Sequence, residues 1–379
     1  MPSQRLDQEK TRNRKIVQAF LFLLTLGFLV YFCISSNNLA VLIQSLPTIN
    51  LFWIACAVGG VILNWMMDSL VLHTLIFHSS GGRYGFGRAF HVTMVGQYFN
   101  SITPYALAGQ PMQFMALIRQ GIPSGVAVST LVNKFLAYQT SLTAYSLLVI
   151  LIKYPFFRSK IQGFMALAFV GFLYQAGIVI ALILFSYSPG FTTKIIRGAV
   201  WVLTKIHLVK NPEKTGENVK KQLEFFLQNN RVIRGKRLVG VKIYTITVIQ
   251  LTSLFLVPFF IYKAFHNPGT PIFDMISAQS FVTMISSYTP LPGAAGVAEG
   301  SFLVIFQIFF APEIIQQAML LWRLIAYYSC IVVGAFFAVP ERRHAGIKFS
   351  FGDTPQTSLK TEQATNAEQS TNSGGMKHE

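Results

Sequence analysis

The segment Asn100-Ser-Ile-Thr-Pro104-Tyr-Ala-Leu-Ala-Gly109-Gln-Pro111 lies inside a stretch, residues 89–118, that carries no Asp, Glu, Lys or Arg. Two prolines and one glycine within eight residues break a helix, because proline lacks a backbone donor and clashes with the preceding turn. Backbone groups freed by such a break cannot face lipid. This first break (residues 100–111) therefore predicts a re-entrant hairpin or a broken helix that lines a cavity.

A second apolar stretch is interrupted in the same way. Residues 275–310 carry Glu299 as their only charged residue, and their break reads Thr289-Pro-Leu-Pro-Gly-Ala-Ala-Gly296. In this second break (residues 289–296) the interruption comes from four residues, which are Pro290, Pro292, Gly293 and Gly296. The corresponding residues of the first break are Pro104, Gly109 and Pro111.

Six other stretches are long and apolar enough to cross about 30 Å of hydrocarbon as helices. They cover about residues 15–34, 50–77, 123–152, 161–187, 241–262 and 314–340. The composition agrees, with 52% hydrophobic and only 12% charged residues, about half the usual share of charge. The sequence therefore predicts an all-α polytopic membrane protein with about six full spans and two broken hairpins, and it excludes a pair of soluble domains.

Basic residues outnumber acidic ones in the chain, and the formal net charge is +17. Nucleic-acid-binding proteins of such charge are rich in charged residues, so we expect no nucleic-acid partner. Five Lys and Arg lie in residues 1–15 and eleven in residues 191–237, whereas residues 34–49 carry none. By the positive-inside rule both termini are expected in the cytoplasm. Lys153, Arg158 and Lys160 do not fit, because they fall on a predicted outer loop.

Three segments follow from this pattern. Residues 1–15 form a basic cytoplasmic N-terminus, residues 16–340 a membrane domain, and residues 341–379 a tail whose polar composition predicts disorder. Within the membrane domain, residues 191–237 are predicted to form two amphipathic helices on the cytoplasmic membrane surface. Their charge either only sets the topology or also binds anionic lipid.

With this orientation the two halves of the membrane domain have the same parts in opposite directions. The spans 50–77 and 123–152 enclose the first break, and the spans 241–262 and 314–340 enclose the second. Inverted repeats with paired broken helices are typical of transporters whose site lies near the midplane. The alternative is that two helix kinks occur by chance.

Four ionisable residues lie alone inside apolar spans, and they are Asp68, Lys134, Glu299 and Arg323. A charge at the bilayer centre costs at least about 2.5–3.5 kcal/mol, so each needs a partner, water or a function. Glu299 could pair with Arg323 until a lipid phosphate displaces it. It could instead take up a proton or a cationic headgroup while Arg323 holds the phosphate. A permanent structural ion pair is the third alternative.

The remaining candidates have similar alternatives. Lys134, with Tyr138 one turn later, could bind a headgroup or pair with Asp68, for which a structural role is favoured. Asn100, Thr103 and Gln110 could line a headgroup path or satisfy freed backbone groups. The histidines lack metal-ligand spacing and no nucleotide-binding motif is present, so no metal or other cofactor is expected.

The two breaks resemble the motifs of the lysylphosphatidylglycerol synthase transmembrane-region family, also called flippase-like, over about residues 15–340. The first motif is carried by residues 100–111 with Arg119-Gln-Gly121, the second by residues 290–300, and Arg323 resembles the arginine of the last helix. The sequence departs from the family pattern at Ala108, where many members have glycine, and at Ala294-Ala295 in the second glycine run.

The resemblance implies a bacterial plasma-membrane protein related to the flippase part of the multiple peptide resistance factor. Such a protein would move an anionic or aminoacylated phospholipid, or another lipid-linked headgroup, between leaflets. Full-length members add a cytoplasmic domain that lysylates phosphatidylglycerol from lysyl-tRNA, and the 39 residues after Pro340 are too few for it. We therefore expect no enzymatic activity from this chain alone.

Two alternatives stay open. The first is a phosphatidylglycerol lysyltransferase or a subunit of that system, and the second is a non-catalytic envelope scaffold. Phospholipids, mainly anionic ones, are the expected partners. A second copy of the chain and a separate lipid-modifying enzyme are the protein partners that the sequence leaves open.

Overall fold

The computed structural model describes residues 49–160, 164–188, 212–267, 269–287, 289 and 291–338, with the isolated positions 190, 194 and 198. Within these residues the chain is helical and has no strand. The expected span 15–34, the first predicted amphipathic helix, Pro290 and the tail 341–379 lie outside the described residues.

The described helices fall into two similar series. The first comprises α3 (Leu51–Ser79), α4 (Phe86–Ile102), the 3₁₀ turn η2 (Pro104–Ala106), α5 (Gly109–Arg119), α6 (Ser124–Lys160) and α7 (Phe164–Tyr187). The second comprises α9 (Pro212–Gly235), α10 (Arg237–Phe255), α11 (Val257–Ala264), α12 (Ile272–Ser286), the 3₁₀ turn η3 (Pro292–Ala294), α13 (Val297–Phe306), α14 (Ile315–Arg323), the π-helical segment η4 (Leu324–Tyr328) and α15 (Ser329–Phe337).

Five described stretches are long and apolar enough to cross a membrane: Leu51–Ser79, Ser124–Lys153, Phe169–Ser186, Arg237–Ala264 and Ile315–Phe337. They correspond to five of the six expected spans. Large apolar side chains are exposed on these helices, among them Ile62, Leu173 and Val248, as is required where lipid is the solvent. The protein is therefore a polytopic all-α membrane protein.

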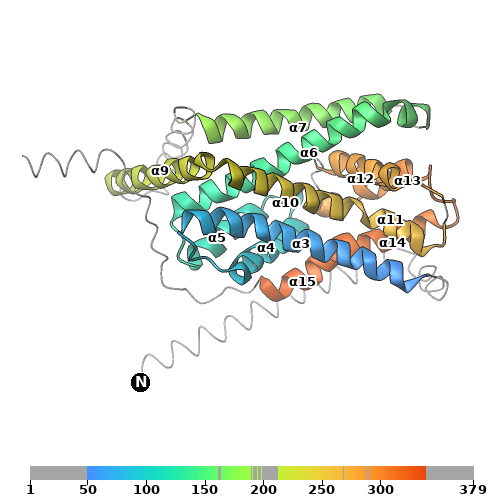
Figure 1. The fold of residues 1–379 in the computed structure, drawn as a ribbon, viewed down its shortest axis with the longest axis horizontal. Helices are drawn as coiled ribbons and strands as arrows, with labels where there is room; N and C mark the ends of the chain where they lie inside the picture. Colours follow the sequence, from blue (N-terminus) through green and yellow to red (C-terminus); the bar gives the residue numbers. More distant parts are fainter. Residues whose placement is uncertain are drawn as a thin grey trace, which may run out of the picture.

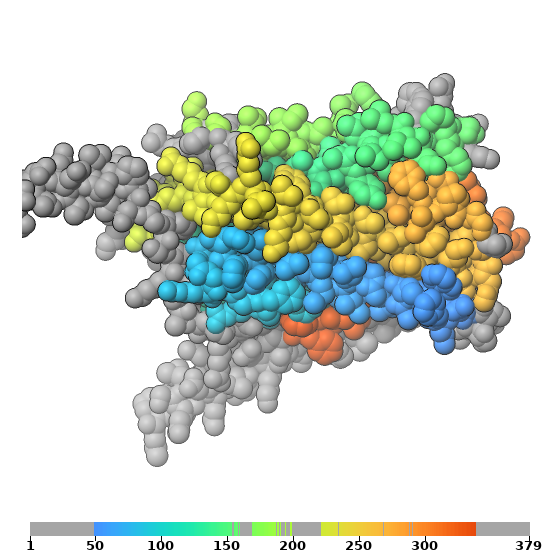
Figure 2. Space-filling model, viewed as in Figure 1, coloured from blue at the N-terminus to red at the C-terminus, as the bar shows by residue number. Residues whose placement is uncertain are grey.

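The two broken hairpins enter the molecule from opposite ends. Figure 1 shows α4 and α5 in one half of the long axis, and α12 and α13 in the other half. Each hairpin turns near the middle, where η2 and η3 contact each other. The spans α3 and α10 pack side by side across one face (Figure 2). The fold thus brings the two breaks together at the centre.

One expected loop is part of a helix. Residues 153–160, predicted to lie in an outer loop, are the last turns of α6, which continues past Pro155 to Lys160. Lys153 Nζ lies 2.5 Å from Asp274 Oδ1 in the first turn of α12. Lys153, one of the three basic residues that did not fit the charge pattern, is therefore paired with an acidic residue.

The second amphipathic helix is α9, and one of its faces is buried against α6. Gln222 Oε1 accepts a hydrogen bond from the backbone N–H of Gly125 over 2.9 Å. Further along, Asn230 Oδ1 accepts from Ser129 Oγ and from Asn133 Nδ2, each over 2.6 Å. The helix that the sequence predicts on the membrane surface is thus attached to the start of a span by its side-chain amides.

Candidate functional site

The two breaks have the same backbone geometry. In each, an extended residue precedes the proline that begins the 3₁₀ turn: Thr103 has φ −115° and ψ 145°, and Leu291 has φ −85° and ψ 149°. The second and third residues of each turn then have positive φ, 54° and 53° in η2 and 58° and 54° in η3. Each turn leads into a short helix that returns the chain to its own end of the molecule.

Close packing explains two of the glycines in the breaks. A Cβ atom on Gly293 would lie 2.2 Å from the Tyr327 ring, and one on Gly109 would lie 1.8 Å from Asn100 Oδ1. Gly293 also has φ +58°, where a side chain is strained. Glycine at these positions lets each break pack directly on the neighbouring residue.

Arg323 and Glu299 form an ion pair behind the second break. Glu299 lies in the first turn of α13, where its Oε2 accepts the Gly296 N–H over 2.7 Å. Its Oε1 lies 2.8 Å from Arg323 Nε, close in distance but misaligned for a hydrogen bond. Arg323 Nη1 donates to the Gly293 carbonyl over 2.9 Å. The arginine, with a side chain only 4% exposed, is thus held against the break.

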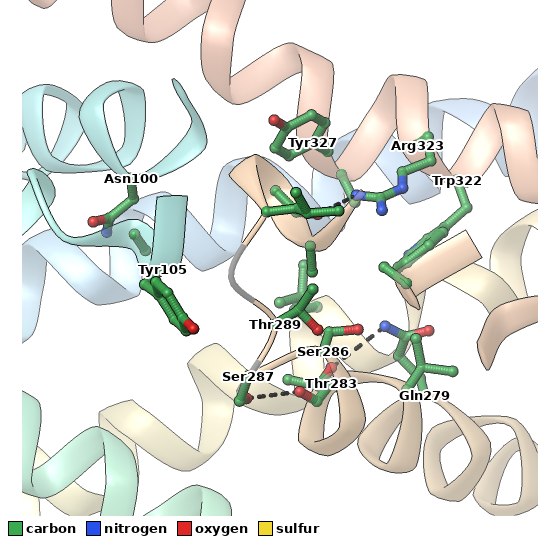
Figure 3. Close-up of a pocket in the computed structure, with 18 residues that line it drawn as sticks. Asn100, Tyr105, Gln279, Thr283, Ser286, Ser287, Thr289, Trp322, Arg323 and Tyr327 are labelled. Carbon is green, nitrogen blue, oxygen red and sulfur yellow. Dashed lines mark hydrogen bonds between the residues drawn. The ribbon is translucent and has the colours of Figure 1, made fainter. Parts of the chain in front are cut away.

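A central cavity of about 300 Å³ lies between the two breaks. Figure 3 shows Asn100 and Tyr105 of the first break on one side, and Trp322 and Arg323 of the last helix on the other. The polar side chains of α12 and the segment after it close a third side, and these are Gln279, Thr283, Ser286, Ser287 and Thr289.

Several buried polar atoms of the central cavity have no hydrogen-bond partner among the described residues. They are Arg323 Nη2, Trp322 Nε1, Gln279 Oε1, Asn100 Oδ1 and Ser286 Oγ. Leaving such an atom unsatisfied costs about 1–3 kcal/mol, more when it is charged. The residues that carry these atoms all line one cavity, so they favour a polar guest that brings an acceptor for Arg323 and a donor for Gln279.

Tyr327 joins the two breaks. Its hydroxyl donates to the Ser101 carbonyl over 2.7 Å, and its ring covers Gly293. It lies in the π-helical segment η4, a distortion that often marks functional sites. Sequence reasoning missed Tyr327, Trp322 and Gln279. The available signal for Tyr327 was its position four residues after Arg323, the same spacing as Lys134 and Tyr138.

Comparison with known proteins identifies the family of the chain. Residues 16–334 match the family described as the lysylphosphatidylglycerol synthase TM region. The chain belongs to this family. It is also similar to the UPF0104 membrane protein of Archaeoglobus fulgidus, with 23% identity over 274 residues that cover 72% of this chain and 81% of the relative.

In this member of the lysylphosphatidylglycerol synthase transmembrane-region family, Lys134 does not line the central cavity. Its Nζ lies 2.9 Å from Asp68 Oδ2, and both side chains are 9% exposed. The ion pair joins α3 to α6. Tyr138, one turn after Lys134, packs against an apolar cluster that includes Leu251 and Phe255.

The other predicted residues of the first break have separate surroundings. Thr103 Oγ1 donates to the Phe99 carbonyl and accepts the Ala108 N–H, so it satisfies backbone groups at the break. Gln110 and Pro111 line an apolar groove of about 450 Å³ between α5, α6 and α7. Among the residues that the structure describes, no three His, Cys, Asp or Glu side chains group as metal ligands.

Proposed function

We propose that this protein is a lipid translocator that moves an anionic or aminoacylated phospholipid, or another lipid-linked headgroup, between leaflets. The observation that carries the proposal is the central cavity between two broken hairpins, which is lined by the buried Arg323, whose Nη2 has no hydrogen-bond partner among the described residues. Sites of this kind in inverted-repeat transporters lie at the repeat interface. Membership of the lysylphosphatidylglycerol synthase transmembrane-region family is consistent with a lipid substrate.

The polar groups of the central cavity suit a phosphodiester headgroup. Arg323 offers a fixed cation and Trp322 Nε1 a further donor, which match phosphate oxygens. Gln279 Oε1 is an acceptor for a glycerol hydroxyl or an ammonium group. Tyr105 and Leu291 at the rim are 54% and 51% exposed. The headgroup would enter past this rim while the acyl chains stay in lipid.

The ion pair leaves room for a phosphate. Glu299 engages Nε and the Gly293 carbonyl engages Nη1, so a phosphate oxygen can bind Nη2 without displacing either. In our proposal Glu299 holds the guanidinium in place and offsets its charge when the cavity is empty.

The orientation belongs to the same proposal. Both termini and α9 lie on the cytoplasmic side of the cell membrane. The exposed basic residues around the α9–α10 junction, which are Lys221, Arg231, Lys236 and Arg237, then face the anionic cytoplasmic leaflet. Each such residue contributes about 1 kcal/mol near a charged surface.

The experiment is a leaflet-transfer assay in proteoliposomes with fluorescent phosphatidylglycerol and, separately, fluorescent lysylphosphatidylglycerol. Wild-type protein is expected to speed transfer over protein-free vesicles, and Arg323→Ala and Glu299→Gln are expected to slow it. Arg237→Gln is the matched control, because it removes an exposed cation far from the cavity. Equal rates for all variants would refute the site, and no transfer of any lipid class would refute the function.

The lysyltransferase and scaffold alternatives give different results in cells. If the chain is required for synthesis, lipid extracts from cells lacking it contain no lysylated phosphatidylglycerol. If it is a translocator, the lysylated lipid persists but is missing from the outer leaflet. A scaffold predicts that Arg323→Ala and Glu299→Gln have no effect on function.

A further inference from the structure

The two halves of the fold each carry a cation followed by a tyrosine at the same place. Lys134-Phe-Leu-Ala-Tyr138 lies on α6 and Arg323-Leu-Ile-Ala-Tyr327 on the last span. Lys134 comes 30 residues after Pro104, the first residue of η2, and Arg323 comes 31 residues after Pro292, the first residue of η3. Because η2 and η3 have matching positive φ angles, the two pentapeptides are equivalent positions of the repeat.

The equivalence extends to burial, and each cation has a carboxylate partner, although the two carboxylates come from non-equivalent helices, α3 before the first break and α13 after the second. Lys134 is 7% exposed and Arg323 is 4% exposed. Each lies close to one carboxylate, Asp68 at 2.9 Å and Glu299 at 2.8 Å. A permanent structural pair is a weak explanation for two such arrangements, because apolar residues of similar volume stabilise a buried position at least as well.

The two cations differ in what surrounds them. Arg323 lines the central cavity and contacts the carbonyl of its own break, Gly293. Lys134 Nζ has one hydrogen-bond partner among the described residues, Asp68, although an ammonium group has three donors. Lys134 is therefore a buried cation whose remaining donors have no partner among the described residues. Its hydrogen bond goes to Asp68 of α3 and not to the first break.

We propose that Lys134 and Tyr138 form a second phosphate site, which takes the phosphodiester of the transported lipid when the two halves exchange conformations. The inference rests on the proposed function. In inverted-repeat transporters, one repeat rocks against the other around the site. In the exchanged state, Lys134 contacts the first break in the way that Arg323 contacts the second break in the described state. Asp68 pairs with Lys134 in the described state, and the lipid phosphate takes the place of Asp68 in the exchanged state.

Photo-crosslinking tests the second site directly. Benzoylphenylalanine is placed at position 138 or 327 of the full chain, which is reconstituted in phosphatidylcholine vesicles that contain radiolabelled phosphatidylglycerol. Leu142, one turn further along α6 and 1% exposed, is the control position. Labelled lipid is expected at 138 and 327 and not at 142.

Charge variants then assign the signal at position 138. Lys134→Gln is expected to lower crosslinking at 138 at least about tenfold, because a charge-assisted hydrogen bond to the phosphate is lost. Lys134→Arg retains it, and Asp68→Asn raises it by removing the competing carboxylate. Gel filtration confirms that each variant is folded, and if Lys134→Gln fails to fold, the other two variants decide.

Each other outcome has one meaning. Crosslinking at 327 without crosslinking at 138 refutes the second site and leaves the proposed function intact, whereas its absence at both positions refutes the proposed function. A signal at 138 that ignores Lys134→Gln, or that Asp68→Asn fails to raise, also refutes the second site. Loss of the lipid signal at 138 in excess inorganic phosphate supports a site that recognises the phosphate group of the lipid.

Discussion

The hydroxyl of Tyr327 donates a hydrogen bond to the backbone carbonyl of Ser101 over 2.7 Å, across 226 residues of sequence. Ser101 lies at the start of the first break, and the Tyr327 ring lies against Gly293 in the second. One side chain thus holds together two backbone interruptions that enter from opposite ends of the molecule. Any movement of one hairpin against the other must change this contact.

Tyr327→Phe should weaken the contact between the two breaks. The substitution leaves the buried Ser101 carbonyl without its partner, which costs about 1–3 kcal/mol of unfolding free energy. Thermal unfolding in detergent measures the effect. Tyr105→Phe is the control, because Tyr105 is 54% exposed. If both variants unfold at the wild-type temperature, the hydrogen bond does not join the breaks.

Gly293→Ala should be more damaging than a glycine change elsewhere in the same hairpin. The new Cβ would lie 2.2 Å from the Tyr327 ring, and a positive φ alone costs about 1–2 kcal/mol for a residue with a side chain. Gly300→Ala is the matched control, since its Cβ meets nothing within 4 Å and it lies in helix α13. We expect Gly293→Ala to lower the unfolding temperature and Gly300→Ala to keep or raise it. Equal behaviour would contradict the close packing.

The Asp68–Lys134 pair should behave as a coupled unit in stability measurements. Lys134→Met leaves a buried carboxylate unpaired, which costs about 3–5 kcal/mol. Asp68→Leu with Lys134→Met should recover most of that loss, because no buried charge remains. Unfolding of the two single variants and the double variant in detergent gives the coupling energy. Additive losses would show that the two residues do not depend on each other.

Asn230 should control how firmly α9 is attached to α6. Its side-chain oxygen accepts from Ser129 and from Asn133, and its Nδ2 donates to the Ser186 carbonyl over 3.3 Å. Asn230→Leu leaves these groups unpaired, so limited proteolysis within residues 212–235 should become faster. The exposed Glu224→Ala is the control. Unchanged proteolysis of Asn230→Leu would show that the amide network does not hold the helix.

Much of this architecture could be predicted from residue chemistry alone. Pro104 and Pro292 each lie within a few residues of a further proline and a glycine, a combination that interrupts a helix, so both breaks were visible in apolar runs. The end of α6 was not, because Pro155 follows Lys153 in a region that reads as a loop. Asp274, more than a hundred residues away in sequence, pairs with Lys153. Sequence periodicity cannot predict such a long-range contact.

The charged residues of the candidate site could be predicted from the sequence, whereas its neutral polar residues could not. Glu299 and Arg323 are conspicuous because a charge in an apolar span is costly. Gln279 and Trp322 lie in apolar helices and resemble ordinary membrane residues, and only the fold shows that they line the central cavity. Gln110 shows the opposite case, since it looks polar enough for a headgroup path but lines an apolar groove.

The most direct test of the central claim is the initial rate of phosphatidylglycerol transfer between leaflets for Arg323 variants in proteoliposomes. Arg323→Lys keeps the charge and loses the planar fork, whereas Arg323→Gln loses both. We predict that transfer falls from wild type to Arg323→Lys and further to Arg323→Gln, at equal amounts of folded protein. If all three proteins transfer the lipid at the same rate, the central cavity is not the path of the headgroup.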